Sequence, residues 1–145
     1  MKFSSLAVQE SPGFALQQKV VFPSGIVGFP DFREAEIIYQ PSELPFMWLK
    51  GSSKDKISFI VVDPAGLVQN YEVELSDTDV ESMGIKSPAD ALILNIATLH
   101  KGPTSRITLN LIGPIVINRS TLLARQVIIA NCQKYSAQHL LFETH

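Results

Sequence analysis

Two carboxylates in the segment YEVEL, residues 71–75, have the spacing of a possible acid–base pair. Glu72 and Glu74 alternate with apolar residues, so both point to one face of a predicted strand, as a general acid and its partner base would. Such a pair needs a pocket that excludes water and shifts at least one pKa. Nothing in the sequence indicates such a pocket, and exposed strand carboxylates are far commoner. We therefore predict no catalytic residues.

The remaining reactive side chains are isolated from one another. His100, His139 and His145 are far apart and lack the spacing of metal ligands, so we predict no metal site. Cys132 follows an apolar run, which is typical of a small buried hydrophobic residue. A single cysteine cannot form a disulfide within the chain, which suits a reducing cytosol. The GxSxG, P-loop, GxGxxG and HExxH motifs are missing, and we expect no cofactor.

Acidic and basic residues are segregated along the 145-residue chain, although its formal net charge is only −2. Segment 63–90 has one basic residue, Lys86, and these acidic ones: Asp63, Glu72, Glu74, Asp77, Asp79, Glu81 and Asp90. Segment 91–142 has no acidic residue and these basic ones: Lys101, Arg106, Arg119, Arg125 and Lys134. Two interpretations remain open: a solvated surface with clustered charges, or an acidic face that meets a basic partner.

Direct binding of nucleic acid would need a basic patch and aromatic side chains that stack on bases. The basic residues after position 100 could form such a patch. Tyr135 is, however, the only aromatic residue between Tyr71 and Phe142. A solvated basic face is therefore favoured, and we predict no direct nucleic-acid partner.

The composition is that of an ordinary globular protein, 46% hydrophobic and 18% charged. Its length fits one domain, residues 1–145, with a sizeable core. No apolar run approaches the roughly 18 residues of a membrane helix. Residues 1–16 lack the apolar region of a signal peptide. We expect a cytoplasmic protein with no membrane partner.

Short apolar runs, divided by Pro, Gly, Asn and Ser, indicate a succession of strands. Alternation in RITLNL, residues 106–111, predicts that Thr108 points outward. Segment 91–100 is almost continuously apolar, which predicts a central strand buried on both faces. We predict an all-β, mainly antiparallel, barrel-like domain of about nine or more strands. The strands are expected at 19–22, 36–40, 46–50, 57–62, 71–75, 91–100, 106–111, 114–118 and 125–130.

One short helix is predicted after residue 75. Ser76 is a good N-cap, Asp79 stands three residues later as in a capping box, and Gly84 can end the helix. Segment 87–90 repeats the capping pattern, but strand residues follow at once, so only a single turn is expected there.

Trp48 has two possible roles. With Phe46 and Leu49 it is expected to pack in the core, as most aromatic residues of apolar strands do. If Trp48 or Phe29 were exposed, either would instead suit a surface that binds a helix in a groove.

Five segments together resemble FliW, a family of flagellar assembly factors. PFMWLKGSSKDKISFIVVDP, residues 45–64, is similar to that family's PFLWLQS…FVVVDP segment. The other similar segments are FPSGIVGFPDF (22–32), YEVELSDTDVESMGI (71–85), DALILNIATL (90–99), and NLIGPIVIN (110–118) followed by RQVII (125–129). The resemblance covers about residues 20–130. The N-terminal 18 residues and the C-terminal SAQHLLFETH depart from the family pattern.

The resemblance implies a non-enzymatic, cytoplasmic regulator of flagellum assembly. Proteins of this family bind flagellin, whose terminal helices are amphipathic. They also bind CsrA, a small, basic, dimeric RNA-binding regulator that represses translation of flagellin mRNA. Rising flagellin would occupy the FliW protein and leave CsrA free to repress, whereas export of flagellin would release the FliW protein to antagonise CsrA.

The resemblance makes two surfaces candidate protein-binding sites. One is a set of acidic residues that would meet the basic CsrA: Asp63, Glu72, Glu74, Asp77, Asp79 and Glu81. The other is the glycine-flanked loop with Ile26, Val27 and Phe29, which would line an apolar groove for a flagellin helix. A wet strand face and an ordinary turn explain the same residues without a partner. The alternative function is a regulatory β-barrel that binds a ligand or RNA directly.

Overall fold

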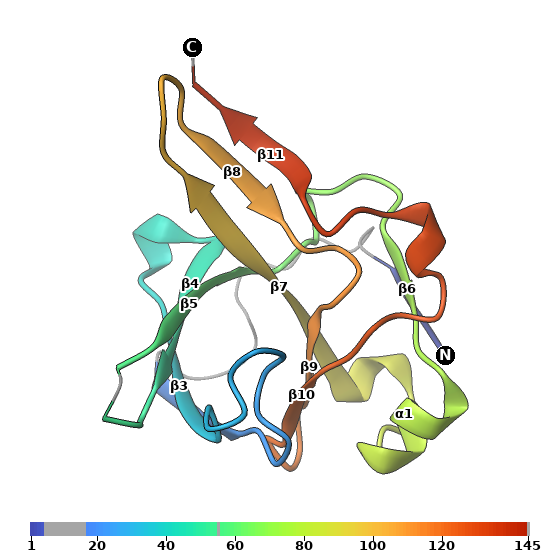
Figure 1. Ribbon diagram of the computed structural model, residues 1–145. Helices are drawn as coiled ribbons and strands as arrows, with labels where there is room; N and C mark the ends of the chain where they lie inside the picture. Colours follow the sequence, from blue (N-terminus) through green and yellow to red (C-terminus); the bar gives the residue numbers. More distant parts are fainter. Residues whose placement is uncertain (5–16, 55, 145) are drawn as a thin grey trace.

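The computed structural model describes residues 1–4, 17–54 and 56–144, and antiparallel strands make up most of it. Nine strands form one sheet that curls into a barrel-like shape, and two more form a small second sheet (Figure 1). The all-β, mainly antiparallel prediction is confirmed. The strands are β1 (Lys2–Ser4), β2 (Gln17–Val21), β3 (Glu34–Ile38), β4 (Phe46–Gly51), β5 (Ser58–Val62), β6 (Glu72–Glu74), β7 (Ala91–His100), β8 (Arg106–Leu109), β9 (Ile115–Asn118), β10 (Ala124–Gln126) and β11 (His139–Glu143). The helix is α1 (Asp77–Ser82), and single 3-10 turns cover Pro41–Glu43, Pro88–Asp90 and Cys132–Lys134.

The two ends of the large sheet approach each other without forming a full strand pair. The strand order is β10-β9-β7-β5-β4-β3-β2. Val21 at the end of β2 forms a single parallel bridge with Leu123, and its N–H donates to the carbonyl of Leu122 at 3.1 Å. One bridge between the end strands therefore completes the barrel-like shape.

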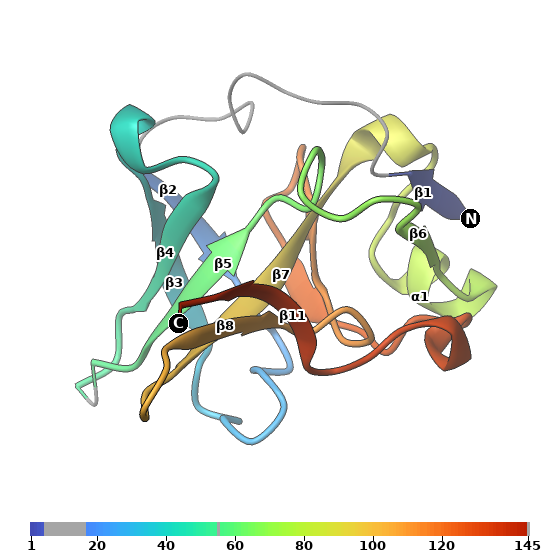
Figure 2. The same cartoon turned by 90° about the horizontal axis from the view of Figure 1, so that it is seen from above.

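Strand β7 connects the barrel to a projecting arm. Its residues 91–94 pair with β9, whereas residues 97–100 pair with β8. Residues 95–97 pair with β5, which occupies the other edge of β7. β11 pairs with the free edge of β8, so the end of β7, β8 and β11 form a three-stranded arm (Figures 1 and 2).

Two apolar cores lie on the two faces of the sheet. The inner core, on the concave side, includes Val20, Phe22, Leu49, Val61 and Ile115. The outer core joins the other face of the sheet to β1, β6 and α1, and includes Phe3, Val62, Val73, Leu75, Ala97, Leu109 and Val116. The barrel strands are therefore buried from both sides wherever β1, β6 and their connections cover them.

Two predictions of burial fail at the arm. Segment 91–100 was expected to be buried on both faces, but Thr98 and Leu99 are exposed. These two residues lie in the arm, beyond the part of β7 that the two cores cover. Thr108 was expected to point to solvent, but it is buried, and its Oγ1 lies 2.9 Å from His100 Nε2.

Helix α1 begins after Ser76 and ends before Gly84, as predicted, but the carboxylate of Asp79 lies against Arg125 and does not complete a capping box. Ser76 Oγ accepts a hydrogen bond of 3.1 Å from the N–H of Asp79. At the other end Gly84 has a φ of +66°, and the N–H of Ile85 donates to the carbonyl of Val80 at 3.0 Å. This is the Schellman pattern that closes many helices. Val80 packs against the outer core, so the helix has one apolar anchor and keeps its acidic first turn at the surface.

A buried polar network fixes the middle of β7. The hydroxyl of Tyr71 donates to the carbonyl of Leu111 at 2.6 Å and accepts from Asn95 Nδ2 at 3.0 Å. Asn95 Nδ2 also donates to the carbonyl of Asn110 at 3.0 Å. Burial raises the pKa of Tyr71 to about 12, so the hydroxyl keeps its proton at neutral pH. The network joins the segment before β6 and the turn after β8 to the point where β7 changes partners.

Removing the hydroxyl of this network should destabilise the fold. We expect Tyr71→Phe to lower the free energy of unfolding by about 1–2 kcal/mol, because it leaves two buried groups short of a partner. Tyr135→Phe is the matched control, since that hydroxyl bonds to Asn70 and Glu72 at exposed positions where water can replace it. Urea unfolding followed by circular dichroism measures both losses. Equal losses would contradict a special role for the buried network.

Candidate functional site

Strand β4 exposes a tryptophan on the outer face of the sheet. Met47 and Leu49 are buried in the inner core, whereas Trp48 is 49% exposed and Lys50 is exposed. The expectation that Trp48 packs in the core is therefore wrong. The two-residue period of a strand puts Trp48 on the face of Lys50 and not on that of Leu49. The other predicted role, a surface that binds a helix in a groove, is the one that fits its exposure.

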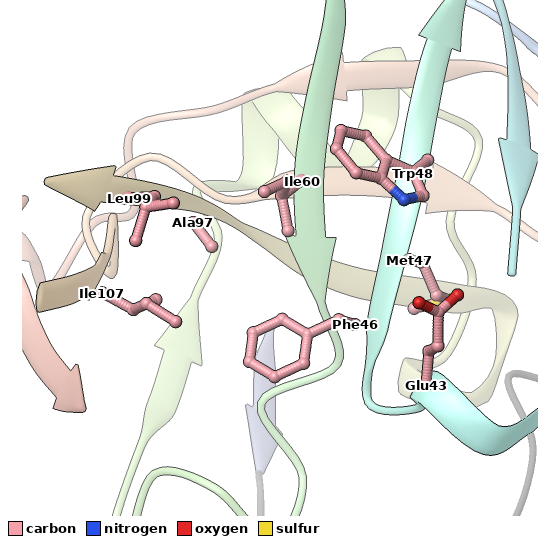
Figure 3. A pocket seen from close by; sticks show the side chains of 8 residues that line it. All are labelled: Glu43, Phe46, Met47, Trp48, Ile60, Ala97, Leu99 and Ile107. Atoms are coloured by element: carbon pink, nitrogen blue, oxygen red, sulfur yellow. The ribbon is translucent and has the colours of Figure 1, made fainter. Parts of the chain in front are cut away.

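Trp48 lines an apolar groove across β4, β5, β7 and β8, which encloses about 390 Å³ (Figure 3). Trp48 is opposite Ile60, and Ile60 is opposite Ala97, so the three form one cross-strand row. Leu99 and Ile107 form the next row. The described residues that line the apolar groove are Glu43, Phe46, Met47, Trp48, Ile60, Ala97, Leu99 and Ile107.

The apolar groove is the open side of the outer core. Phe46, Ile60 and Ile107 pack against that core but are only partly buried. Their outer surfaces, with the half-exposed Leu99, face solvent. A contiguous apolar surface of this kind often marks a binding site.

The C-terminal strand has an exposed aromatic residue near the apolar groove. Phe142 is paired with Ile107 of β8, directly after a register shift between Leu140 and Phe142. Phe142 is 54% exposed, whereas the preceding Leu141 packs against the outer core. Phe142 is not among the residues that line the apolar groove.

Five of the predicted acidic residues lie on two consecutive elements at one edge of the molecule. Glu72 and Glu74 are on β6, and Asp77, Asp79 and Glu81 are on α1. We call these five residues the acidic edge. Both views show β6 and α1 on the side of the molecule away from β3 and β4 (Figures 1 and 2).

Basic residues neutralise part of the acidic edge. Arg125 Nη1 lies 3.4 Å from Asp79 Oδ1, and Lys2 Nζ lies 3.8 Å from Glu72 Oε1. Charges that are far apart along the chain are therefore paired in space. Surface pairs contribute only about 0–1 kcal/mol and are easily exchanged for a partner's charges.

Asp63 lies apart from the acidic edge, at the end of β5. Its Oδ1 accepts a hydrogen bond of 2.9 Å from the N–H of Ala65. Burial raises the pKa of Asp63, while this hydrogen bond and the charge of Arg119 oppose the shift. The contacts of Asp63 thus stabilise the turn that follows β5.

The glycine-flanked loop forms a tight two-residue turn. Ile26 and Phe29 exchange two backbone hydrogen bonds, of 3.1 and 2.7 Å, around Val27 and Gly28. Gly28 has a φ of +84°, which glycine adopts without strain. The turn buries Ile26 in the inner core and leaves Val27 72% exposed at its tip.

The loop is fixed to the barrel at both sides of its tip. The N–H of Val27 donates to Gln126 Oε1 at 3.1 Å. The ring of Phe29 packs edge-on against that of Phe59, with 5.2 Å between the centroids. The ring of Phe59 also packs edge-on against that of Phe32, again with 5.2 Å between the centroids. These contacts hold Val27 on a separate part of the surface, and the loop does not contribute to the apolar groove.

The other reactive side chains lie singly. Cys132 is half-buried and packs against the outer core. Across residues 1–4, 17–54 and 56–144, no three His, Cys, Asp or Glu side chains are grouped so that they could hold a metal ion. Within the same ranges, no helix has the length and apolar character to span a bilayer.

Comparison with known proteins identifies the family. A family model described as FliW protein matches residues 7–141. The chain belongs to the FliW family. It is 36% identical over 122 residues to the flagellar assembly factor FliW of Moorella thermoacetica, which covers 84% of this chain and 77% of that protein. The flagellar assembly factor FliW of Bacillus subtilis is 31% identical over 123 residues, which covers 85% of each chain.

A solved structure agrees with this FliW assignment. The crystal structure of a flagellar assembly factor FliW matches with a TM-score of 0.72 and 30% sequence identity, over 86% of this chain and 85% of that one. The family resemblance and the fold class are therefore confirmed. The FliW family model ends at residue 141, so Phe142 lies beyond the matched residues.

The sequence left open that Trp48 belongs to a groove that binds a helix, but it did not indicate the other lining residues of this FliW-family chain. A signal for the exposure of Trp48 was present in FMWLK, where Trp48 shares its strand face with Lys50. Ile60, Leu99 and Ile107 had no comparable signal, because their places depend on the pairing of distant strands.

The glycines of the FliW-like loop should differ in their tolerance of alanine. Gly25 and Gly28 both have positive φ, which costs a residue with a Cβ about 1–2 kcal/mol. A Cβ at Gly25 would also lie 2.7 Å from the carbonyl oxygen of Pro30, whereas nothing lies within 4 Å of one at Gly28. We expect Gly28→Ala to lower the free energy of unfolding by about 1 kcal/mol and Gly25→Ala by clearly more, in urea unfolding curves. The opposite order would show that the close contact is relieved without cost.

Proposed function

We propose that this chain is a non-enzymatic, cytoplasmic assembly factor that binds flagellin and antagonises the translational regulator CsrA. In this proposal the two partners compete, so rising flagellin frees CsrA to repress flagellin translation. Export of flagellin then returns the assembly factor to CsrA. Membership in the FliW family supports the role in flagellar assembly, and the two partners follow from the segments that resemble that family.

The observation that best supports a binding function is the exposed apolar groove. Trp48 and Leu99, two large apolar side chains, are about half exposed within one contiguous surface. Tryptophan is enriched among the residues that dominate binding energy at protein interfaces. The amphipathic terminal helices of flagellin present the kind of apolar stripe that such a groove buries.

The acidic edge is the proposed contact for CsrA, with Asp63 as a further acidic candidate. Charge complementarity with a basic protein would act mainly on the association rate and on selectivity. The loop with Ile26, Val27 and Phe29 is a second proposed contact for flagellin, made through the exposed Val27 and Phe29, because Ile26 is buried in the inner core.

The purified protein should co-elute with flagellin, and separately with CsrA, in size-exclusion chromatography. Adding excess flagellin to the complex with CsrA should release CsrA, because the proposal makes the partners competitors. A mixture of flagellin and CsrA alone is the control for a direct contact between them. Unchanged elution with both partners would reject the proposed function, and a stable ternary complex would reject the competition.

Reversing charge on the acidic edge should slow the association with CsrA. We expect Glu72→Lys combined with Glu74→Lys to lower the association rate several-fold at low salt and less at high salt, because salt screens exposed charges. The matched control is Asp31→Lys combined with Glu34→Lys, which changes the same net charge at exposed positions in and before β3. Surface plasmon resonance at two salt concentrations measures both rates. Equal slowing by the two pairs would mean that net charge alone explains the effect, and it would contradict the assignment of the acidic edge as the contact for CsrA.

A further inference from the structure

We propose that the apolar groove binds one amphipathic α-helix of a protein partner, laid across the strands, with a basic residue of that helix against Glu43. This inference rests on the proposed function in one respect, that flagellin supplies such a helix in the cell. It adds the site, the length of the helix and the charge at one of its ends.

The position of the apolar groove favours a helix over an extended peptide. An extended peptide binds best at a free sheet edge, where it can pair its backbone groups. The floor of the apolar groove is instead formed by β4, β5, β7 and β8, each of which is paired on both sides. An extended segment lying on this face would leave its own backbone groups unpaired, at a cost of about 1–3 kcal/mol for each buried group. A helix satisfies its backbone internally and presents only side chains.

The length of the helix follows from the number of strands it crosses. The apolar side chains that line the groove run from Trp48 on β4 to Ile107 on β8, with β5 and β7 between. Neighbouring strands lie about 4.8 Å apart, so three intervals span roughly 14 Å. At a rise of 1.5 Å per residue, a helix of about 10 residues covers this distance. Such a helix offers an apolar stripe of about four anchors at i, i+3, i+4 and i+7 spacing.

The charge at one end of the apolar groove sets the polarity of the partner. Glu43 is the one charged side chain among the described residues that line the groove. It is exposed at the end of the 3-10 turn before β4, on the side of Trp48 away from Leu99 and Ile107 (Figure 3). A helix that covers Trp48 removes water from around Glu43. A lysine or arginine at that end of the partner would compensate the carboxylate.

Trp48 is the only tryptophan of the chain, so its emission reports directly on the occupation of the groove. The probe is a tryptophan-free, hydrocarbon-stapled helical peptide with a leucine stripe and one lysine, made in two forms with the lysine at either end. With the full chain we expect one form to shift the Trp48 emission to shorter wavelength and to protect it from acrylamide quenching. Absence of both effects for both peptides would overturn the proposal.

Variants test the apolar lining of the groove and the charge of Glu43 separately. We expect Leu99→Ala to weaken the better peptide about tenfold, with unchanged circular dichroism. Glu43→Lys should weaken the lysine peptide several-fold, and a peptide with glutamate in place of that lysine should recover the loss. The control Glu34→Lys, an exposed acid of β3 outside the groove, should leave binding unchanged. No recovery by the charge-reversed peptide would overturn the assignment of Glu43.

Three further outcomes are decisive. A shift of Trp48 emission that depends on protein concentration, without any peptide, would mean that a second copy of this chain covers the groove, and would reject the proposal. If flagellin binds the wild-type chain and the Leu99→Ala variant equally, the helix site is wrong while the proposed function stands. If the peptide binds as expected but flagellin does not, the proposed function fails and the helix site stands.

Discussion

Strand β7 pairs with three other strands, and this pairing determines where the barrel ends and the arm begins. Its ten residues are paired with β9 at one end, β8 at the other and β5 in the middle. The side chains of its N-terminal part face the two cores, whereas Thr98 and Leu99 are exposed, Leu99 in the apolar groove. The apolar groove arises where the strands continue but the outer core ends. The buried bonds of Tyr71 with Leu111 and Asn95 hold this change of partner in place.

Apolar side chains of the groove remain in contact with water, so folding alone does not gain the free energy of burying them. Each Å² of apolar surface left exposed forgoes about 25 cal/mol of stabilisation. Trp48 and Leu99 are each about half exposed, and Trp48 lies between two fully buried residues of β4, Met47 and Leu49. The free energy becomes available when a partner covers the groove. The rigid floor, in which every strand has two neighbours, keeps the cost of ordering that surface low.

Local patterns predicted local structure well in this chain. A strand lies in each of the nine predicted segments, although only residues 125 and 126 of segment 125–130 belong to one. Helix α1 has the predicted cap at Ser76 and glycine end at Gly84, because these features depend on neighbouring residues only. Strands β1 and β11 were not predicted, because each is short and is defined by distant partners, β6 and β8. Alternation with Lys50 indicates that Trp48 lies on the exposed face of β4. Burial was predicted instead because most aromatic residues of apolar strands pack in a core. The groove itself joins residues from four strands, and no local pattern contains that arrangement.

The folded chain also changes the meaning of its charge pattern. Segment 63–90 is acidic and segment 91–142 is basic, yet in the fold Arg125 of the basic segment pairs with Asp79 of the acidic one, and Lys2 pairs with Glu72. The acidic edge is thus a set of partly paired carboxylates on the far side of the outer core from the groove. Val73 under this edge and Ile60 at the groove contact the same outer core. Competition between two proteins at these two surfaces therefore requires either a partner large enough to cover both or a shift of the core that they share.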